Sequence, residues 1–554
     1  MGARDDGLPT PLGHRLSPSR WNERRVFPYI FLGCLVLLLY VQPHRPDSSR
    51  SRFLSSSSSA SFPAIPSSSS PITPFSVQRH LLPRLDRMES APILTYNASL
   101  TLESARCPTT YRQANRDQLR GEGEEWWPTV SVEELEEGRK KVVDRVRGIF
   151  QGLTPEELEE MLGTGKRGLV FTAGNKDTMA RLLTSLRILR LRHGCALPVE
   201  IFGFPSELQN LDTELKRRIE ELGGVKWKEI EGEMVEGRWK QFQIKGEAIA
   251  RSSFSEILYL DSDNIALTDP SFLFDSPTYR KYGIVLWPDF NRDSAANPIF
   301  RLLSYPCSPL EWQAESGQLL VNKRARGGLN LAALEVARAM MEDSTFWFHM
   351  SGGDKDIFRY AFYLLSLPLA SAPHFPSPLG ALLPSSYAGG HTFCGHTMVQ
   401  YGLDSETEWE RLRERGEVDE RSVREGRDGG HAPPLFAHAN LLKHSGYNNR
   451  PGSTFLHLKK PVDDLLPRNA SSLSPSHPPL SSIRQSGYSH RGICVDIWDA
   501  DSPAGEGGPE GREAEAGIYE QGGVEVMTWV DSWGGVGRTL EELYYREGGV
   551  AGAW

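Results

Sequence analysis

The run Ile257-Leu258-Tyr259-Leu260-Asp261-Ser262-Asp263-Asn264 constrains the fold of this chain more than any other segment. Four large apolar residues in succession predict a β-strand that is buried on both faces, as in a parallel sheet covered by helices. Open α/β sheets bind ligands at the carboxyl ends of their strands, which is where Asp261 and Asp263 stand. On an extended strand the two carboxylates would project from the same side, a geometry that suits a divalent cation.

The Asp-x-Asp spacing occurs twice more, at Asp354-Lys355-Asp356 and at Asp499-Ala500-Asp501. The copy at 499–501 lies in a polar run rich in Gly and Pro, which is typical of turn residues. The spacing alone therefore does not identify a site, and the apolar strand before Asp261 sets the first copy apart. An EF-hand is excluded there, because Ile265 and Ala266 occupy positions that need an oxygen ligand and a glycine.

Apolar and amphipathic segments alternate upstream of Asp261. Strands are expected at 168–172, 199–204 and 257–260, and helices at 179–191, 208–222 and 245–252. This alternation predicts an α/β protein with βαβ units and a mostly parallel central sheet flanked by helices. The turn Ala173-Gly174-Asn175 lacks the G-x-G-x-x-G fingerprint, so no Rossmann dinucleotide site is predicted, although the turn can admit a nucleotide base or ribose.

The first 119 residues differ in composition from the rest of the chain. Arg20, Arg24 and Arg25 precede an apolar run from Val26 to Val41, which is about the length of a short membrane span or of a signal-peptide core. No small-x-small cleavage site follows, which favours an uncleaved signal-anchor helix over 26–42, with residues 1–25 cytoplasmic and the remainder lumenal. Enrichment in Ser and Pro predicts a flexible stem over 43–119. Residues 120–554 are then expected to form one large lumenal α/β domain or two close-packed lobes.

Charge and cysteine content narrow the choice of partners and compartment. The net charge of −9 argues against a nucleic-acid partner. Cys34 lies in the apolar run, and the other five cysteines would meet an oxidising lumen, so their odd number predicts a free or intermolecular thiol. A disulfide is favoured at Cys394 over a zinc site with His391 and His396, because the paired C-x-x-C of such sites is absent.

Seven segments resemble, in matching order over about residues 160 to 450, the fungal Golgi α-mannosyltransferases of glycosyltransferase family 71. They read FTAGNKDT, LPVEIFGFP, SEILYLDSDNIALTDPSFLFDSPTY, GIVLWPDF, ESGQLLVNK, GGDKDIFRYAFYLL and FAHANLLKH. The resemblance implies a GT-A-like fold, a type II Golgi membrane protein, GDP-mannose as donor, Mn²⁺ or another divalent cation as cofactor, and a mannose-terminated glycan as acceptor. It also implies a role in protein glycosylation or cell-wall mannan synthesis, within a Golgi mannosyltransferase complex.

The resemblance assigns binding roles to residues of these segments. Asp261 and Asp263 are the expected metal ligands, and His438 resembles the distal histidine that completes the metal site in many GT-A enzymes. A structural histidine near a helix start, followed by a surface lysine, is the alternative for His438. Donor binding is expected at Ala173, Gly174, Lys245, Asp261 and Lys443, of which Lys443 would meet the phosphates as a point charge.

Catalytic residues are expected in two further segments. Glu315 and Gln318 are placed beside the donor sugar, in a stretch that precedes the apolar strand 319–321 and whose glycine would let the backbone approach a sugar; a solvated turn is the alternative. Asp356 first, and Asp354 second, are expected to face the donor sugar and the acceptor, and either could cap the helix 357–365. Nearby aromatic residues are expected to stack on sugars or to pack in the core: Trp287, Trp312, Trp347 and Phe348.

The stereochemistry follows from the resemblance, since an α-linked product from GDP-α-mannose means retention at the anomeric carbon. Retention can use a covalent intermediate on Asp356 or Glu315, or same-face attack in which the leaving diphosphate takes the acceptor proton. The second route is preferred because no residue stands out as a nucleophile. Three rival functions remain: a retaining hexosyltransferase with another sugar-nucleotide donor, an inactive membrane-tethered glycan-binding protein, and a glycoside hydrolase with paired carboxylates. The choice between α-1,2 and α-1,3 linkage and the identity of the acceptor stay open.

Overall fold

The computed structural model describes residues 71–107, 109, 125–231, 242–303, 305–384, 391–421, 423–424, 431–442, 452–461, 483–489, 492–499, 519–521, 524–529 and 536–549. The predicted cytoplasmic tail 1–25, the predicted signal-anchor 26–42 and the candidate phosphate ligand Lys443 lie outside these ranges. Among the helices within them, none combines the length and the apolar character that a membrane crossing requires.

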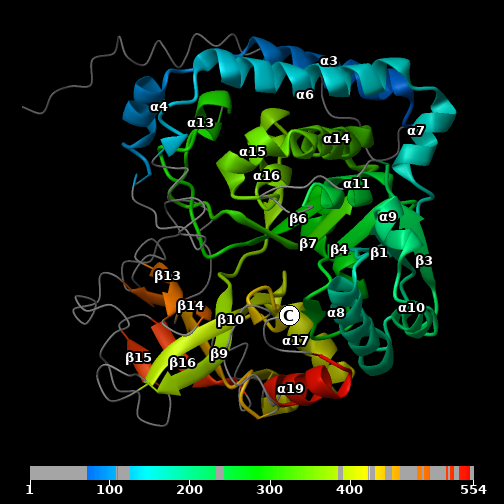
Figure 1. Ribbon diagram of the computed structural model, residues 1–554, viewed down its shortest axis with the longest axis vertical. Helices are drawn as coiled ribbons and strands as arrows, with labels where there is room; N and C mark the ends of the chain where they lie inside the picture. The colour runs from blue at the N-terminus through cyan, green and yellow to red at the C-terminus, as the bar shows by residue number, and fades with distance from the viewer. Residues whose placement is uncertain are drawn as a thin grey trace, which may run out of the picture. The chain divides into compact units, whose positions relative to one another are not determined.

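A seven-stranded sheet lies between the helices of the described part of the chain (Figure 1). Its strands, in spatial order, are β3 (Val225–Glu229), β2 (Val199–Gly203), β1 (Arg167–Thr172), β4 (Glu256–Leu260), β7 (Ala314–Asn322), β6 (Ile284–Pro288) and β8 (Ala370–Ser371). The pairs β3–β2, β2–β1, β1–β4 and β6–β8 are parallel, whereas β7 runs antiparallel to both of its neighbours. The predicted α/β class and mostly parallel sheet are therefore confirmed.

Strand β4 is buried on both faces, as its four apolar residues predict. Ile257 and Tyr259 point into one hydrophobic core, and Leu258 and Leu260 point into another on the opposite face. All four side chains are fully buried. Burial of both faces leaves only the carboxyl end of the strand open to a ligand.

Helices cover both faces of this sheet. They are α6 (Val132–Gly152), α7 (Pro155–Leu162), α8 (Lys176–Arg187) with its π-helical extension η1 (Ile188–Arg192), α9 (Pro205–Gln209), α10 (Thr213–Glu220), α11 (Ile244–Arg251), η2 (Pro270–Asp275), α12 (Pro277–Tyr282), α13 (Ile299–Leu302), η3 (Ala325–Gly328), α14 (Leu329–Glu342), α15 (Ser344–Ser351) and α16 (Ile357–Leu364). The helix expected over 208–222 is replaced by α9 and the shorter α10, because Asp212 caps a new helix start.

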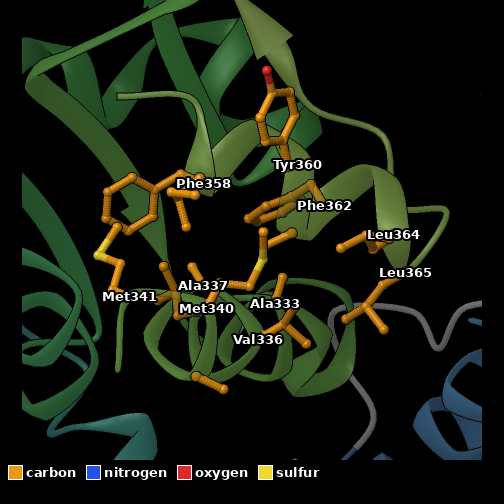
Figure 2. Close-up of a cluster of buried hydrophobic side chains, with 14 of the residues drawn as sticks. Ala333, Val336, Ala337, Met340, Met341, Phe358, Tyr360, Phe362, Leu364 and Leu365 are labelled. Carbon is orange, nitrogen blue, oxygen red and sulfur yellow. The ribbon is translucent and has the colours of Figure 1, made fainter. Parts of the chain in front are cut away.

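Helices α14 and α16 form the centre of one core (Figure 2). Ala333, Ala337 and Met340 of α14 face Phe358 and Phe362 of α16. The small side chains of Ala333 and Ala337 leave room for the large rings of α16. This packing fixes the position of α16, and with it the loop that precedes the helix.

The boundary of the predicted stem is wrong. Residues within 43–119 form α3 (Pro74–Ser90) and α4 (Tyr96–Glu103), and α3 lies beside α6 (Figure 1). Val77, Leu81 and Leu85 recur at helical spacing and are fully buried. The Ser- and Pro-rich composition on the amino-terminal side conceals this apolar stripe, so the folded body begins well before residue 120.

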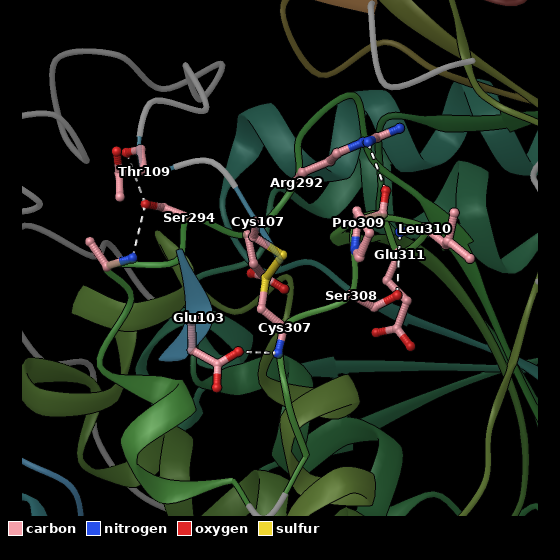
Figure 3. Close-up of a disulfide and its surroundings, with 12 residues drawn as sticks. Glu103, Cys107, Thr109, Arg292, Ser294, Cys307, Ser308, Pro309, Leu310 and Glu311 are labelled. Carbon is pink, nitrogen blue, oxygen red and sulfur yellow. Dashed lines mark hydrogen bonds between the residues drawn. A yellow bond between two sulfur atoms is a disulfide. The ribbon is translucent and has the colours of Figure 1, made fainter. Parts of the chain in front are cut away.

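A disulfide ties the same segment to the body. Cys107 is bonded to Cys307, and the Glu103 carboxylate accepts a 2.8 Å hydrogen bond from the Cys307 N–H (Figure 3). A second disulfide joins Cys394 to Cys494, as predicted for Cys394, so the zinc alternative has no free thiol there. Cys195 is the free, buried cysteine among the described residues, in agreement with the odd count.

A second sheet, antiparallel throughout its described pairs, follows the first and was not predicted. Its strands, in spatial order, are β13 (Ile483–Ser489), β14 (Gly492–Asp499), β10 (His391–Tyr401), β9 (Ser377–Pro384), β12 (His457–Pro461), β16 (Val524–Thr528) and β15 (Tyr519–Gln521), and β11 (Pro434–His438) joins β10 to β5 (Asn264–Ala266). Helices α17 (Ser405–Glu414) and α19 (Val536–Arg546) flank it. The pairing of β11 with β5 places this sheet directly beside the turn that carries Asp261 and Asp263.

The candidate sugar-stacking aromatics lie in the core. Trp287, Trp347 and Phe348 are fully buried, and the Trp287 indole N–H donates to the Tyr401 carbonyl at 2.9 Å. Trp312 is 7% exposed and packs on Phe375 with ring centroids 4.4 Å apart. The core-packing interpretation is therefore the one that the structure supports.

The buried carboxyl of Glu408, on α17, should make the free energy of unfolding depend on pH. Burial raises the pKa of this carboxyl to about 8, although it accepts a 2.9 Å hydrogen bond from the Leu403 N–H. Because the folded state keeps its proton to a higher pH than the unfolded state, Glu408 lowers stability as pH rises from about 4.5 to about 8. We expect Glu408→Gln to raise Tm by several degrees at pH 9 and by little at pH 5, measured by calorimetry. The exposed Glu414→Gln on the same helix should show no such pH trend, and an equal gain at both pH values would contradict the argument.

Candidate active site

Asp261 and Asp263 occupy a tight turn between β4 and β5. The expectation that both residues lie on an extended strand is therefore wrong. The Asn264 N–H donates to the Asp261 carbonyl at 3.0 Å and closes the turn. The Ser185 hydroxyl of α8 donates to the Ser262 carbonyl at 3.0 Å. This turn makes the two carboxylates converge. Their predicted position at the end of β4 is confirmed, although the backbone there is a turn and not a strand.

His438, at the end of β11, completes a three-residue cluster. Antiparallel pairing sets His438 opposite Asn264, and the Ala439 N–H donates to the Asp263 carbonyl at 2.9 Å. The His438 Nε2 atom lies 3.1 Å from Asp263 Oδ1 and 3.7 Å from Asp261 Oδ2. One ligand atom from each of the three side chains lies within 4.8 Å of the others. The structure therefore brings together residues 175 positions apart, as the resemblance implied.

Glu315 and Gln318 lie within strand β7, not in a turn before it. Gly317, between them, packs against the imidazole ring of His438. A Cβ atom on Gly317 would stand 2.3 Å from His438 Nδ1. Glu315 Oε1 lies 3.2 Å from that same nitrogen and accepts a 2.7 Å hydrogen bond from the Gly317 N–H. The glycine thus makes room for His438, where the sequence suggested room for a sugar. Gln318 is fully buried and accepts a 2.6 Å hydrogen bond from Asn264 Nδ2.

Replacement of Gly317 should disturb the cluster without touching any of its carboxylates. A Cβ atom at position 317 and the His438 Nδ1 atom cannot lie only 2.3 Å apart. We therefore expect Gly317→Ala to displace the His438 ring and to weaken Mn²⁺ binding about tenfold to a hundredfold. Isothermal titration with MnCl₂ measures this. Gly148→Ala on α6, whose Cβ would meet no atom within 4 Å, is the matched control and should bind Mn²⁺ as the wild type does. Unchanged affinity in Gly317→Ala would contradict the role of this glycine.

The pKa values of the residues in and around this cluster are shifted from their ordinary values. Burial disfavours the charged form of His438, but Glu315 and Asp263 outweigh it and raise its pKa to about 10. Burial likewise opposes ionisation of Glu315, yet His438 and Lys245 bring the pKa of that carboxyl down to about 2. Burial raises the pKa of Asp261 against the pull of Lys245. The imidazole of His438 and the carboxylates of Glu315 and Asp263 therefore stabilise each other's charged forms.

Lys245 supplies a second positive charge and sits between two segments of the site. Its ammonium group lies 2.7 Å from Asp354 Oδ2 and 3.1 Å from Asp261 Oδ1, and it donates to the Ser316 carbonyl at 3.0 Å. Burial works against its charge, but the Asp261 and Asp354 carboxylates raise its pKa above the ordinary value. Tyr259 orients the same acid, since its hydroxyl donates to Asp261 Oδ1 at 2.7 Å. Lys245 thus joins the Asp-x-Asp turn to the loop before α16.

The structure separates the two candidate acids of the loop before α16. Asp354 lines the cavity described below and pairs with Lys245. Asp356 is fully buried, does not line that cavity, and accepts 2.8 and 2.9 Å hydrogen bonds from Arg359 Nε and the Ala314 N–H. Burial raises the pKa of Asp356 to about 6. The ranking that placed Asp356 before Asp354 as the residue facing substrate is therefore corrected.

A cavity of about 570 Å³ opens in front of these residues. Its volume falls within the range of about 300–1,000 Å³ that is usual for small-molecule sites. Its polar lining includes Asn175, Asp177, Arg181, Glu207, Lys245, Asp261, Asp263, Glu315, Asp354, Lys355 and His438, and its apolar lining includes Ala173, Phe204, Phe242 and Ile244. Ala173 and Gly174, predicted to bind the donor, therefore lie where a donor could reach them.

Arg181 of α8 is a residue of the site that the sequence reasoning missed. Its guanidinium lies 3.7 Å from Asp263 Oδ2 and is paired with Asp177. Asp177 and Arg181 are four residues apart on a helix that starts after a strand end, and that spacing was the available signal. A guanidinium at the edge of the cluster can meet an anion that enters the cavity.

The donor set fits a divalent cation such as Mn²⁺. Two carboxylates and one imidazole are ligands that Mn²⁺ accepts, and their spacing within 4.8 Å matches a shared ion. Glu315 and Asp263 raise the pKa of His438, and the proton held there would have to leave for Nε2 to bind a cation, since metal ligands must be deprotonated. Asp261, Asp263 and His438 would hold the ion.

The chain's sequence similarity begins at β1 and includes the Asp-x-Asp turn. Residues 166–307 match the family model described as "Mannosyltransferase putative". This match confirms the predicted resemblance to a family of mannosyltransferases.

Named relatives and solved structures each match part of the chain. Two α-1,2-mannosyltransferases of Candida albicans are similar to it: MNN23, 26% identical over 35% of this chain and 39% of that protein, and MNN21, 34% identical over 23% and 20%. The aligned segments thus span two fifths or less of these relatives. The galactosyltransferase LgtC matches 37% of this chain and 73% of its own at 15% identity and a TM-score of 0.26; mouse xyloside xylosyltransferase 1 matches 36% and 81% at 14% and 0.24.

Proposed function

We propose that this chain is a metal-dependent, retaining mannosyltransferase that moves mannose from GDP-mannose to a mannose-containing glycan and forms an α-mannosidic bond. The observation that carries the proposal is the Asp261, Asp263 and His438 cluster on a cavity of about 570 Å³, with both aspartates inside the segment that matches a mannosyltransferase family model. The parallel sheet with its acidic turn at the end of β4 supports a GT-A-like fold.

The cation's chemistry is to offset the negative charge that develops on the departing diphosphate. Lys245 and Arg181 border the same region and supply further positive charge to an anionic donor. Because Lys245 is held by three groups from Asp261, Ser316 and Asp354, it is fixed before the donor arrives and needs little reorganisation. Tyr259 keeps Asp261 oriented for its role as ligand.

The residues that line the cavity favour retention by same-face attack. Asp354 and Glu315 line the cavity beside the cation cluster, yet Asp354 is paired with Lys245 and Glu315 with His438. A carboxylate engaged by a cation is a weaker nucleophile, because its charge is already stabilised. The donor's leaving diphosphate then takes the acceptor proton, and Asp354 and Glu315 position the reacting groups.

The acceptor and the location of the enzyme complete the proposal. The related proteins are named as α-1,2-mannosyltransferases, which supports a mannose-terminated acceptor for this chain. We place it in the Golgi membrane as a single-pass type II protein, in protein glycosylation or mannan synthesis and in a complex with other mannosyltransferases. The two disulfides support a lumenal, oxidising compartment.

A donor panel tests the proposal and its alternatives. The purified chain is incubated with α-mannobiose, Mn²⁺ and one of GDP-mannose, GDP-fucose, UDP-glucose or UDP-galactose, and the product is examined by proton NMR. Transfer from GDP-mannose alone, with an α-configured new linkage, is expected, and the spectrum also assigns the linkage position. Transfer from another donor would favour the alternative hexosyltransferase, and binding without transfer would favour the glycan-binding protein.

A further inference from the structure

Part of the cavity lining belongs neither to the cation cluster nor to the Lys245 network. It is formed by the turn after β1 and the segment after β2, with Ala173, Gly174, Asn175, Phe204 and Glu207. In the sheet order, β1 is next to β4 and β2 is next to β1. Adjacent strands are about 4.8 Å apart, so the end of β2 is displaced by about 10 Å from the Asp-x-Asp strand. A nucleoside whose diphosphate is held near Asp261 and Asp263 would place its base toward this end of the cavity.

Asn175 and Glu207 present a defined hydrogen-bonding pattern there. Asn175 Oδ1 accepts a 3.0 Å hydrogen bond from the Thr178 N–H, which fixes the side-chain amide and turns Nδ2 to the other side. Nδ2 lies 3.5 Å from Glu207 Oε1. Gly174 permits this approach, since a Cβ atom on it would stand 2.4 Å from Glu207 Oε2. The site therefore offers one N–H donor beside the two acceptor oxygens of a half-buried carboxylate.

The bases differ in how they match this pattern. Guanine presents an acceptor, O6, followed by two donors, N1–H and the N2 amino group. Uracil presents an acceptor, a donor and an acceptor, so its O2 would face a carboxylate oxygen. Adenine and cytosine present a donor where Asn175 needs an acceptor. A polar group that a bound base covers and leaves unpaired is costly, so each mismatch lowers affinity.

We propose that Asn175 and Glu207 read the hydrogen-bonding edge of guanine and that Glu207 determines the preference for a guanosine-diphosphate-linked donor. Asn175 Nδ2 donates to O6, and the Glu207 carboxylate accepts from N1–H and from the N2 amino group. Apolar contacts from Ala173 and Phe204 suit the faces of the ring. This inference rests on the proposed function, because it assigns the specificity of the same donor site.

The test is a comparison of four diphosphates on the full chain with Mn²⁺, by isothermal titration calorimetry. The wild type is expected to bind GDP about tenfold more tightly than IDP, which lacks the N2 amino group, and about a hundredfold more tightly than UDP. Glu207→Gln replaces one acceptor by a donor and should weaken GDP binding about tenfold to a hundredfold. The same variant should bind XDP more tightly than GDP, because xanthine carries an oxygen in place of the amino group.

A gain of XDP binding cannot come from misfolding, which keeps the test decisive. The matched control is Glu214→Gln on α10, whose side chain is 60% exposed and paired with Arg217, and its preference should equal that of the wild type. If the wild type transfers mannose but Glu207→Gln keeps the wild-type preference for GDP, the reading of guanine is overturned and the proposed function stands. If the wild type neither binds these diphosphates nor transfers mannose, both are overturned.

Discussion

Asp263→Ala should abolish mannosyl transfer while leaving the chain folded. Asp263 is 9% exposed, contacts His438 at 3.1 Å and faces Arg181 at 3.7 Å, so its loss removes one ligand and the group that orients another. A catalytic cation contributes several kcal/mol of charge stabilisation, and each 1.4 kcal/mol is about tenfold in rate. We therefore expect transfer from GDP-mannose to α-mannobiose to fall at least about a thousandfold at saturating Mn²⁺.

The controls separate loss of the cation from loss of the fold. Asp263→Asn keeps the shape of the side chain and removes its charge, and it should be almost as defective as Asp263→Ala. Asp144→Ala removes an aspartate on α6 whose side chain is 49% exposed, and its transfer rate should equal that of the wild type. Circular dichroism and Mn²⁺ titration accompany the rates. A folded Asp263→Ala variant with near-normal, Mn²⁺-dependent transfer would contradict the assignment of this ligand.

Lys245→Met should produce the largest change in stability, and the size of that change should depend on the cation. Its ammonium group stands 2.7 Å from Asp354 and 3.1 Å from Asp261, and removal of one partner of a buried ion pair costs about 3–5 kcal/mol. We expect Tm to fall by several degrees in the presence of a chelator. Saturating Mn²⁺ should restore more stability to Lys245→Met than to the wild type, because the cation then balances Asp261.

A second buried lysine gives the matched control for this experiment. Lys459 of β12 lies 2.7 Å from Asp496 of β14, in the antiparallel sheet. Lys459→Met should also lower Tm, but Mn²⁺ should restore no more stability to it than to the wild type. Thermal unfolding followed by calorimetry, with chelator and with Mn²⁺, compares all three proteins. Equal recovery in both variants would show that Lys245 does not share its carboxylates with the cation site.

The sequence revealed the central sheet and the acidic turn because both depend on local patterns. A run of four apolar residues marks β4, and the polar residues at its end mark the edge that binds ligands. The position of His438 required the family resemblance, since its approach depends on the pairing of β11 with β5. Nothing in the spacing of residues 175 positions apart shows that they meet.

Other features depend on tertiary contacts that a sequence does not display. The helix α3 was hidden within a Ser- and Pro-rich region, although Leu81 and Leu85 show its apolar side. Asp356 and Asp354 are both acidic and only two residues apart, yet one is paired with Arg359 in the core and the other faces the cavity. The glycine at position 317 predicts a close approach, and the group that approaches is His438 rather than a sugar. Such distinctions need the fold itself.

The measurement that tests the central claim most directly is mannose transfer by the wild-type chain as a function of Mn²⁺. GDP-mannose labelled in the sugar is incubated with α-mannobiose and the purified protein, first with excess chelator and then with increasing MnCl₂, and the labelled trisaccharide is counted. The account predicts no transfer above background with chelator and a saturable rise with Mn²⁺, with a midpoint that Gly317→Ala shifts to higher concentration. Transfer that proceeds equally well with chelator, or an absence of transfer at any Mn²⁺ concentration, would contradict it.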